Sequence, residues 1–589
     1  MRSARQGYRP AAGAPSVGGR VPTWHLFLRA DADDGVRAYG GRRRPPDTEE
    51  KTMNRSRTSA LRAVALAATG ATALALAVMP VAAANAAPGT ACDKRNNNTV
   101  AKLLDCVSAA GAMEHLNALQ EIADANGGNR AVDTAGYEAS VDYVVQTLQA
   151  AGWQVSIDEF DYLLPLTPEL HQLTPQDVVH PAGSFSEGSG SGSVTGTIIP
   201  VDLVLAQPRT PVTSGCEDAD FEGLDFSGAT DIALVQRGTC EFGVKARNAQ
   251  EAGAEAVVIM NQGNAPDRMD VLTNVTLIGE NPDALDIPVI STSFDAGASL
   301  AQPGSTATVT QIVENHPQKN VIAELPGANP DNVVMAGAHL DSVPEGPGIN
   351  DNGSGSAALL EIAQNMSKLK PQNTVRLAWW GAEEVGLVGS AGYVAGLTDT
   401  ERDRIALYLN FDMIASPNYV FMVYDGDESS FEAPVVVPPG SVEIEDLFER
   451  YYTSIGQPYD DAEFSGRSDY EAFILAGIPA GGLFTGAEEE KTPEQAAIWG
   501  GTAGEWLDPC YHQSCDDIDN LSMQALEVNS DAIALAVLAY AYSTELVNGV
   551  PGVDVPGGLL LPEPAGPEGT FGRGGGGLDG AHGHDTLTS

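Results

Sequence analysis

Residues 333–384 constrain the fold of this chain more than any other stretch. Two short apolar runs, at residues 333–338 and 374–381, lie on either side of a helical segment at residues 354–366. Short apolar runs that alternate with helices are typical of parallel strands buried on both faces. The alternation continues over residues 320–548, which predicts an α/β fold.

Side chains that bind metals or transfer protons stand at the ends of these apolar runs. Ligands of open α/β sheets bind beyond the carboxyl ends of the strands, so we expect these side chains to meet in one site. Imidazole and carboxylate groups suit Zn²⁺, and a pair of metal ions needs a bridging carboxylate and a spare carboxylate as general base. The candidates are His339, Asp351, Glu383, Glu384 and Asp412, with His512 as a sixth in a loop between two cysteines.

Each of these residues, taken singly, also has a structural explanation. Asp351 is placed to cap the helix that begins near Ser354, and the adjacent pair Glu383 and Glu384 fits a solvated loop. Their joint placement at the ends of predicted strands favours a metal site over these alternatives.

The composition limits the partners of the chain. It has 79 acidic and 32 basic residues and a formal net charge of −47, which argues against binding to a nucleic-acid backbone. A length of 589 residues with 43% hydrophobic content is enough for two or more domains with substantial cores.

The N-terminal region has the pattern of an export signal. Three arginines precede an Ala-rich apolar run at residues 63–79, and residues 84–86 supply an Ala-Asn-Ala cleavage site. We therefore expect a signal peptide at residues 53–86, with Met53 as the true start and residues 1–52 as a mispredicted extension. The alternative is a membrane anchor, but the short run and the cleavage site favour a secreted, extracellular protein that leaves the membrane after cleavage.

All six cysteines lie beyond the predicted signal peptide, in three pairs of neighbours along the sequence. In an oxidising compartment these pairs predict disulfides. A Cys-ligated zinc site is the competing interpretation, but the sequence has no Cys-x-x-Cys motif. The expected disulfides are Cys92–Cys106, Cys216–Cys240 and Cys510–Cys515.

The composition also divides the mature chain into parts. Residues 87–195 and 320–548 are assigned to one discontinuous α/β domain, and residues 196–319 to a β-rich module between them. Residues 161–200 are expected to be rich in loops, and the Gly/Pro-rich tail at residues 549–589 is expected to be disordered. The other expected helices lie at residues 113–123, 137–151 and 244–252, and the other expected strands at residues 153–160, 197–204, 232–235, 256–260, 288–291, 306–313 and 405–411.

Five motifs follow one another along the chain: His339-Leu340-Asp341-Ser342, Asn350-Asp351-Asn352-Gly353-Ser354-Gly355, Trp380-Gly381-Ala382-Glu383-Glu384, Asn410-Phe411-Asp412-Met413 and Tyr511-His512. This ordered set resembles peptidase family M28, the co-catalytic zinc aminopeptidases, and most closely its secreted bacterial leucyl-type members. The resemblance covers most of residues 110–160 and 320–547, and it implies a mixed, mostly parallel sheet of the zinc-exopeptidase type. Residues 196–314, with Arg-Gly-Thr-Cys-Glu-Phe at residues 237–242, resemble an inserted protease-associated (PA) domain.

The resemblance implies two zinc ions per chain and a set of ligands for each. His339 and Asp412 would bind one ion, and Glu384 and His512 the other. Asp351 would bridge the two ions.

The resemblance also implies the roles of the remaining active-site residues. Glu383 would act as the general base for the zinc-activated water and then protonate the leaving amine. Asp341 would orient the ring of His339, and Tyr511 would stabilise the oxyanion. The Cys510–Cys515 disulfide would hold the loop that carries Tyr511.

Four residues resemble positions near the substrate pocket, and each has an alternative explanation or a weaker signal. Arg467 has two equally good interpretations. It could contact the substrate, or it could form an ion pair with Asp469 or another nearby acid. Met413 and Phe484 are more often core residues, and Gly466 carries no chemistry of its own. An apolar pocket here would favour Leu, Met or Phe at the peptide N-terminus.

The predicted function is therefore a secreted metalloaminopeptidase that acts on peptides with free N-termini and is a monomer. A structural Ca²⁺ ion is also expected for an acidic secreted enzyme of this kind, with no ligands assigned. The alternatives are a carboxypeptidase or a glutaminyl cyclase of the same fold, or a non-catalytic protein that binds partners through its PA domain.

Overall fold

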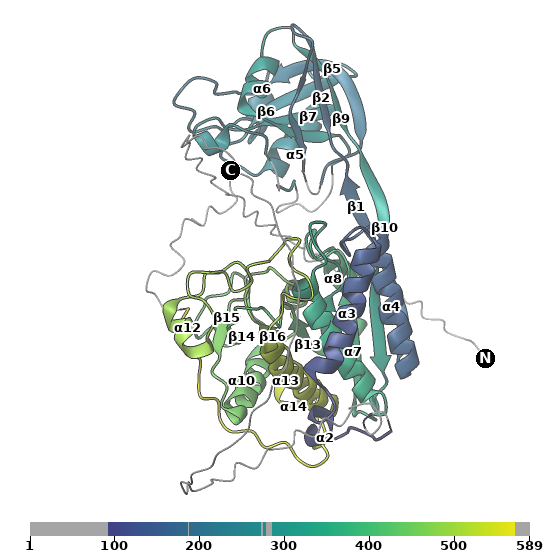
Figure 1. Ribbon diagram of the computed structural model, residues 1–589. Helices are drawn as coiled ribbons and strands as arrows, with labels where there is room; N and C mark the ends of the chain where they lie inside the picture. The colour runs from purple at the N-terminus through teal and green to yellow at the C-terminus, as the bar shows by residue number, and fades with distance from the viewer. Residues whose placement is uncertain (1–91, 93, 186–187, 273–274, 278–284, 572–589) are drawn as a thin grey trace, which may run out of the picture. The chain divides into compact units, whose positions relative to one another are not determined.

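The computed structural model describes residue 92 and residues 94–185, 188–272, 275–277 and 285–571 (Figure 1). The predicted signal peptide, the residues before it and residues 572–589 lie outside this part. Two eight-stranded sheets organise the described residues. No helix among them is both long and apolar enough to cross a membrane.

The first sheet is mixed, with parallel strands at its centre. Strands β12, β11, β13 and β16 run parallel, whereas β10 and β14 pair with them antiparallel. The predicted mixed α/β sheet is therefore confirmed, and every residue of β13 is buried, as its apolar run indicated. In spatial order the strands are β1 (Gln154–Pro165), β10 (Val313–Leu325), β12 (Asn373–Trp380), β11 (Asn329–His339), β13 (Ile405–Phe411), β16 (Ala480–Phe484), β14 (Met422–Tyr424) and β15 (Asp460–Ala462).

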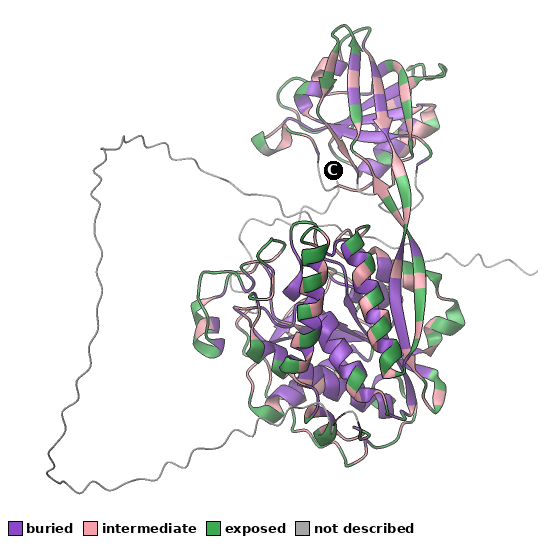
Figure 2. Cartoon of the chain, turned by 45° about the vertical axis from the view of Figure 1, so that its right-hand side comes forward, coloured by how far each residue is buried: buried purple, intermediate pink, exposed green. Residues whose placement is uncertain are grey.

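Helices pack on this sheet: α3 and α4 bury one side each, whereas α7 and α13 are buried over most of their length (Figure 2). Local signals set their ends: at the start of α4 the Thr134 side chain accepts a hydrogen bond from the backbone N–H of Tyr137, and Gly152 ends the helix at φ +89°. Helix α7 contacts α3, α4, α13 and β11. The helices are α2 (Val100–Leu104), α3 (Ala109–Ala125), α4 (Ala135–Ala151), α7 (Gly355–Met366), α8 (Val388–Gly396), α9 (Asp399–Arg404), α10 (Ser441–Ile455), α11 (Tyr470–Leu475), α12 (Pro493–Trp499), α13 (Met523–Tyr542) and α14 (Glu545–Asn548).

The second sheet belongs to the inserted module and has two hydrophobic clusters of its own. Strands β5, β6, β7 and β8 are parallel, and the remaining strands pair antiparallel. In spatial order the strands are β3 (Val178–His180), β2 (Glu169–Thr174), β9 (Thr306–Gln311), β5 (Gly192–Pro200), β6 (Asp231–Gln236), β7 (Ala256–Met260), β8 (Val289–Thr292) and β4 (Ala182–Ser184). The helical segments are α5 (Phe242–Ala252), α6 (Phe294–Leu300), and the short turns η1 (Asp218–Phe221) and η2 (Pro266–Arg268).

The expectation that residues 161–200 are rich in loops is wrong. The end of β1 and strands β2 to β5 occupy much of this stretch, and the second sheet begins with β2, ahead of residue 196. These strands are short or rich in Gly, Ser and Thr, so they lack the apolar alternation that indicates a strand in a sequence. Their hydrogen-bonded partners, such as β9 for β2, come from far along the chain.

The prediction of a disordered tail is wrong for residues 549–571. The carboxylate of Asp460 accepts hydrogen bonds from the backbone N–H of Gly569 (3.0 Å) and of Thr570 (2.8 Å). Arg450 forms an ion pair with Glu563 at 2.9 Å. Residues 549–571 form no helix or strand. They are held instead by polar groups of the first sheet and of the helices that pack on it.

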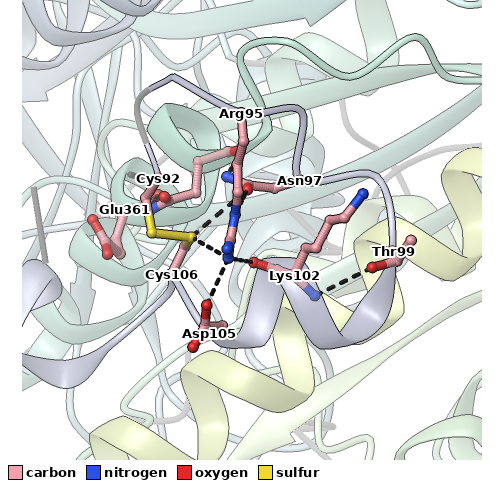
Figure 3. Close-up of a disulfide and its surroundings, with 9 residues drawn as sticks. Cys92, Arg95, Asn97, Thr99, Lys102, Asp105, Cys106 and Glu361 are labelled. Carbon is pink, nitrogen blue, oxygen red and sulfur yellow. Dashed lines mark hydrogen bonds and ion pairs between the residues drawn. A yellow bond between two sulfur atoms is a disulfide. The ribbon is translucent and has the colours of Figure 1, made fainter. Parts of the chain in front are cut away.

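All three predicted disulfides are present, with S–S distances of 2.07, 2.08 and 2.04 Å. The Cys92–Cys106 bond lies beside the guanidinium group of Arg95 (Figure 3). That group donates to the backbone carbonyl of Lys102 at 2.7 Å and pairs with Asp105 at 2.8 Å. The disulfide and the arginine together tie the segment before α2 to the helix and its C-terminal cap.

Candidate active site

The parallel strands and the loops that follow them bring six predicted ligand and base residues to one place. His339 ends β11, and Glu383 and Glu384 follow β12. Asp412 comes directly after β13, and Asp351 lies in the turn η3 (Ile349–Ser354) before α7. The sixth residue, His512, comes from the loop closed by the Cys510–Cys515 disulfide.

Asp351 lies between the two histidines and presents one oxygen to each. Its Oδ1 is 3.2 Å from Nε2 of His339, and its Oδ2 is 3.3 Å from Nε2 of His512. Asp412 Oδ1 stands 3.3 Å from the same His339 nitrogen, and Glu384 Oε2 stands 3.0 Å from the same His512 nitrogen. The site therefore has two halves that share one carboxylate.

The donor set fits zinc. Glu384 Oε1 and Asp412 Oδ1 are buried and accept no hydrogen bond from any described residue. Two ligands that each lie about 2.0–2.2 Å from a tetrahedral zinc ion are about 3.3–3.6 Å apart. The separations in the site, 3.0–3.3 Å, are at or slightly below this range. Buried carboxylate oxygens without donors are costly in a protein interior, so a cation is the natural partner for them.

The titration of these groups reflects their mutual attraction. Burial lowers the pKa of His339, but the facing carboxylates of Asp412 and Glu383 outweigh it and raise the pKa well above its ordinary value. Burial likewise lowers the pKa of His512, but hydrogen bonds to Asp351 and Glu384 raise it to about 11. For Asp351 burial raises the pKa, and the two histidines more than reverse this and hold it below its usual range. A bound metal ion would displace the protons that these histidines carry.

Asp341 contacts both sides of the site. Its backbone carbonyl accepts a hydrogen bond from Nδ1 of His339 at 3.1 Å, whereas its carboxylate Oδ1 is 3.7 Å from the same nitrogen. The carboxylate accepts the backbone N–H groups of Glu383 (3.2 Å) and Glu384 (3.3 Å). The backbone of Asp341 thus orients the histidine, and its side chain positions the two glutamates.

Glu383 is half-buried beside the first half of the site, with Oε2 3.9 Å from Nε2 of His339. Burial and the neighbouring Asp412 raise the pKa of Glu383 well above its ordinary value. A carboxylate of raised pKa next to a metal site suits proton transfer near neutral pH.

Backbone conformations that are unusual for residues other than glycine cluster at this site. Ala382, Met413 and His512 have φ values of +58°, +50° and +56°. The first two are directly adjacent to Glu383 and Asp412, and the third is itself a predicted ligand. Such conformations cost energy and are often found at functional sites.

Two charged residues that support the site carried no signal in the sequence. The buried side chain of Arg130 donates to the backbone carbonyls of Pro347 (2.9 Å) and Gly348 (2.6 Å), in the loop that leads to Asp351. Asp516 accepts the backbone N–H of Asp351 itself at 3.0 Å. Arg130 follows a Gly-Gly-Asn stretch and Asp516 follows Cys515, and neither position indicates a buried charged residue in the sequence.

Arg467 and Tyr511, predicted on separate grounds, are in contact. Arg467 donates to the Tyr511 hydroxyl oxygen at 3.1 Å and pairs with Glu488 at 2.6 Å. The ion pair with a nearby acid therefore exists, although its partner is not Asp469. The ring of Tyr511 stacks on His512 with centroids 3.8 Å apart. Burial raises the pKa of Tyr511 well above its ordinary value, so its hydroxyl keeps a proton to donate.

The other three residues predicted near the pocket have different surroundings. Met413 is buried, and its backbone N–H donates to Asn352. Phe484 is only partly buried, at the end of β16, and packs against the main core. Gly466 has φ +79°, and its N–H donates to the hydroxyl of Tyr470.

Comparisons with known proteins identify the families to which the two domains are similar. Residues 320–537 match peptidase family M28, and residues 194–300 match the PA domain. An aminopeptidase of Pseudomonas aeruginosa is 48% identical over 452 residues, which cover 75% of this chain and 83% of the relative. A probable leucine aminopeptidase 2 of Aspergillus fumigatus is 41% identical over 427 residues, covering 71% and 80%. The solved aminopeptidase from Aneurinibacillus sp. strain AM-1 aligns with a TM-score of 0.50 at 26% identity, over 74% of this chain and 94% of that one.

The fold and these relatives define a zinc-dependent aminopeptidase that acts on peptides. The chain belongs to peptidase family M28 and carries a PA domain.

Proposed function

We propose that the mature chain is a secreted, monomeric aminopeptidase that removes large hydrophobic residues, such as leucine, from peptide N-termini. The export pattern at residues 53–86 and the three disulfides support secretion. The relative named as a probable leucine aminopeptidase supports the substrate preference. The peptidase domain comprises residues 320–548 and the helices and strand that precede the PA domain.

The position of Asp351 carries the proposal that the enzyme holds two zinc ions. One oxygen of this carboxylate faces each histidine, at 3.2 Å for His339 and 3.3 Å for His512. Asp412 completes the first half and Glu384 the second. Bound zinc supplies Lewis-acid activation of the attacking water and of the scissile carbonyl.

Glu383 takes a proton from the attacking water at its carboxylate and delivers it to the departing amine nitrogen. Its position depends on Asp341, which accepts the N–H groups of Glu383 and Glu384. The Tyr511 hydroxyl donates a hydrogen bond to the carbonyl oxygen as negative charge develops there. Arg467 donates to the oxygen of that hydroxyl and so directs its proton away from the guanidinium group.

Met413, Gly466, Arg467 and Phe484 surround the side chain and backbone of the N-terminal substrate residue in this proposal. The acidic groups of the site hold the free α-amine, which explains why removal stops at the chain end. A blocked N-terminus would place an uncharged amide against these carboxylates.

The test is hydrolysis of leucine p-nitroanilide by the mature protein, before chelation, after chelation and after zinc is restored. Activity should disappear with the metal and return with two zinc ions per chain. Glu383→Gln should bind zinc normally and lose about 10²–10⁴-fold in kcat, because the proton acceptor is removed. Glu345→Gln, at an exposed position, is the matched control and should behave as the wild type.

Four results would refute the proposal. Near-native turnover by Glu383→Gln would remove its assigned base. Release of C-terminal residues from an N-acetylated peptide, or cyclisation of N-terminal glutamine without anilide hydrolysis, would establish the carboxypeptidase or the cyclase instead. A zinc-loaded protein inactive on all three substrates would favour a binding role.

A further inference from the structure

A second group of carboxylates lies where β14, β15 and α10 meet, and none of its members belongs to the active site. Asp425 directly follows β14, and Asp461 lies in β15. Glu445 and Glu449 are one turn apart on α10, so they project from the same face of the helix. Asp427 completes the group from the loop after β14. We call these five residues the acidic cluster.

The carboxylate oxygens of the acidic cluster are spaced as cation ligands. One oxygen from each of Glu445, Glu449 and Asp461 lies within 4.8 Å of the others, and the same holds for Asp425, Asp427 and Glu445. Oxygens bound to one calcium ion at about 2.3–2.6 Å are separated by at most about 5 Å. Glu445 belongs to both sets and joins them into one site.

Asp461 has an oxygen with no donor. The residue is 1% exposed, and its Oδ2 accepts hydrogen bonds from the hydroxyls of Ser429 and Ser430. Its Oδ1 is buried and accepts no hydrogen bond from any described residue. A buried carboxylate oxygen without a donor or a cation is strongly unfavourable, so this atom indicates a missing positive partner.

No arginine or lysine in the described part of the chain forms an ion pair with the acidic cluster. The nearest arginine in sequence, Arg450, pairs with Asp446 and Glu563 instead. Burial, followed by repulsion from neighbouring carboxylates, raises the pKa of Glu445 to about 9 and of Glu449 to about 7. The mutual repulsion is therefore not relieved by a positively charged side chain of the described residues.

The loop that carries Asp425 is held in place by hydrogen bonds without a bound cation. The carboxylate of Asp425 accepts hydrogen bonds from the backbone N–H groups of Ser429 (2.8 Å), Ser430 (2.8 Å) and Phe431 (2.7 Å). The backbone N–H of Asp427 donates to Glu445 on α10 at 3.0 Å. These bonds fix the loop against the helix, so a cation entering the cluster would require little rearrangement.

We propose that the acidic cluster binds calcium, with Glu445, Glu449 and Asp461 as the central ligands and Asp425 and Asp427 beside them. A site made only of oxygen donors suits a hard cation and not zinc. Calcium accepts many carboxylates in flexible geometry, whereas magnesium keeps most of its waters and uses one or two. The ion ties α10 to β14 and β15, at the edge of the first sheet.

The test uses the full mature protein with its active site loaded with zinc, so that added calcium has only other sites to fill. Isothermal titration calorimetry should show one calcium ion bound per chain, and excess calcium should raise the melting temperature. Asp461→Asn should lose both effects, with at least a tenfold weaker affinity. Without calcium this variant should melt at or above the wild-type temperature, because the substitution removes repulsion.

Asp446→Asn is the matched control, since Asp446 lies on the same helix outside the acidic cluster, and it should bind calcium as the wild type does. Leucine p-nitroanilide turnover by zinc-loaded Asp461→Asn should be unchanged in calcium-free buffer, which separates this proposal from that for the active site. The absence of binding heat and of a melting shift in the wild type would overturn the proposal. An undiminished calcium response in Asp461→Asn would also overturn it, and an equal response to magnesium would overturn the choice of ion.

Discussion

Asp341 links residues from two strands of the active site. Its carbonyl holds the ring of His339 at the end of β11, and its carboxylate holds the two peptide N–H groups of Glu383 and Glu384 after β12. Groups that hold metal ligands in this way are needed for both affinity and activity. The residue therefore sets the spacing between a histidine and two glutamates without touching the substrate.

Asp341→Asn tests this role. The backbone contact to His339 stays, but one acceptor oxygen becomes an NH₂ group that faces a peptide N–H, so the glutamates lose a fixed position. We expect zinc affinity and kcat/KM to fall by about 10–100-fold in a protein that remains folded. The measurements are zinc titration, steady-state kinetics and circular dichroism.

Asp331→Asn is the matched control, because Asp331 lies at the exposed start of β11 and pairs only with Arg404. A wild-type zinc affinity in Asp341→Asn would contradict the positioning role.

At the scale of elements, apolar runs were the dependable guide. The strands predicted at residues 256–260 and 405–411 coincide with β7 and β13. The candidate ligands His339, Glu384 and Asp412 could be proposed from the sequence because they stand where such runs end, whereas His512 lies in a loop between two cysteines. Strands β2, β3 and β4 gave no such signal, and only the last residues of β5 fell within the strand predicted at residues 197–204. Strands β2 and β5 pair with β9, and β4 pairs with β8, from far along the chain. The roles of Arg130 and Asp516 could not be predicted from the sequence for a related reason. A charged side chain becomes buried only when the tertiary structure offers it partners.

The C-terminal segment, residues 549–571, is an element without secondary structure that nevertheless contributes to stability. The hydroxyl of Thr570 donates to Asp460 and accepts from Gln495 at 3.1 Å, and its N–H also donates to Asp460. Each such bond contributes about 0.5–1.5 kcal/mol. The segment thus forms hydrogen bonds with Asp460, the neighbour of Asp461 in the edge strand β15.

Truncation after Pro551 should therefore lower the free energy of unfolding and the urea midpoint, whereas truncation after Phe571 should leave both unchanged, because all these bonds remain. Thr570→Val should reproduce part of the loss, about 1 kcal/mol, by deleting only the hydroxyl. Leu560→Ser, at a position 97% exposed, is the control. Equal midpoints for the two truncated chains would show that the segment contributes nothing.

For the molecule as a whole, buried acids make stability depend on pH. Burial raises the pKa of Glu445 to about 9, of Glu471 to about 8 and of Asp531 to about 7. Between the unfolded pKa and each of these values the folded chain binds more protons than the unfolded chain, so stability falls as pH rises. His115 acts in the opposite sense, because burial lowers its pKa to about 4 and stability is lost as pH falls below about 6.5.

The melting temperature of the metal-free protein should therefore decrease between about pH 6.5 and about pH 9. Saturating zinc and calcium should reduce this slope, because cations then stabilise the carboxylates in place of protons. The measurement is differential scanning calorimetry across this range, with and without both ions. A melting temperature that rises steadily over the same range would contradict the prediction.

The pairing of β1 with β10 has a consequence for the order in which the chain folds during synthesis. Strand β1 ends at Pro165, which pairs with Val313, and β10 is its one partner in the sheet. Roughly 150 residues separate the two positions, so a ribosome adding about 5–20 residues per second needs roughly 8–30 s to supply the partner. All strands of the second sheet are made in that interval. All strands of the inserted PA domain are thus synthesised before β10 is available to pair with β1.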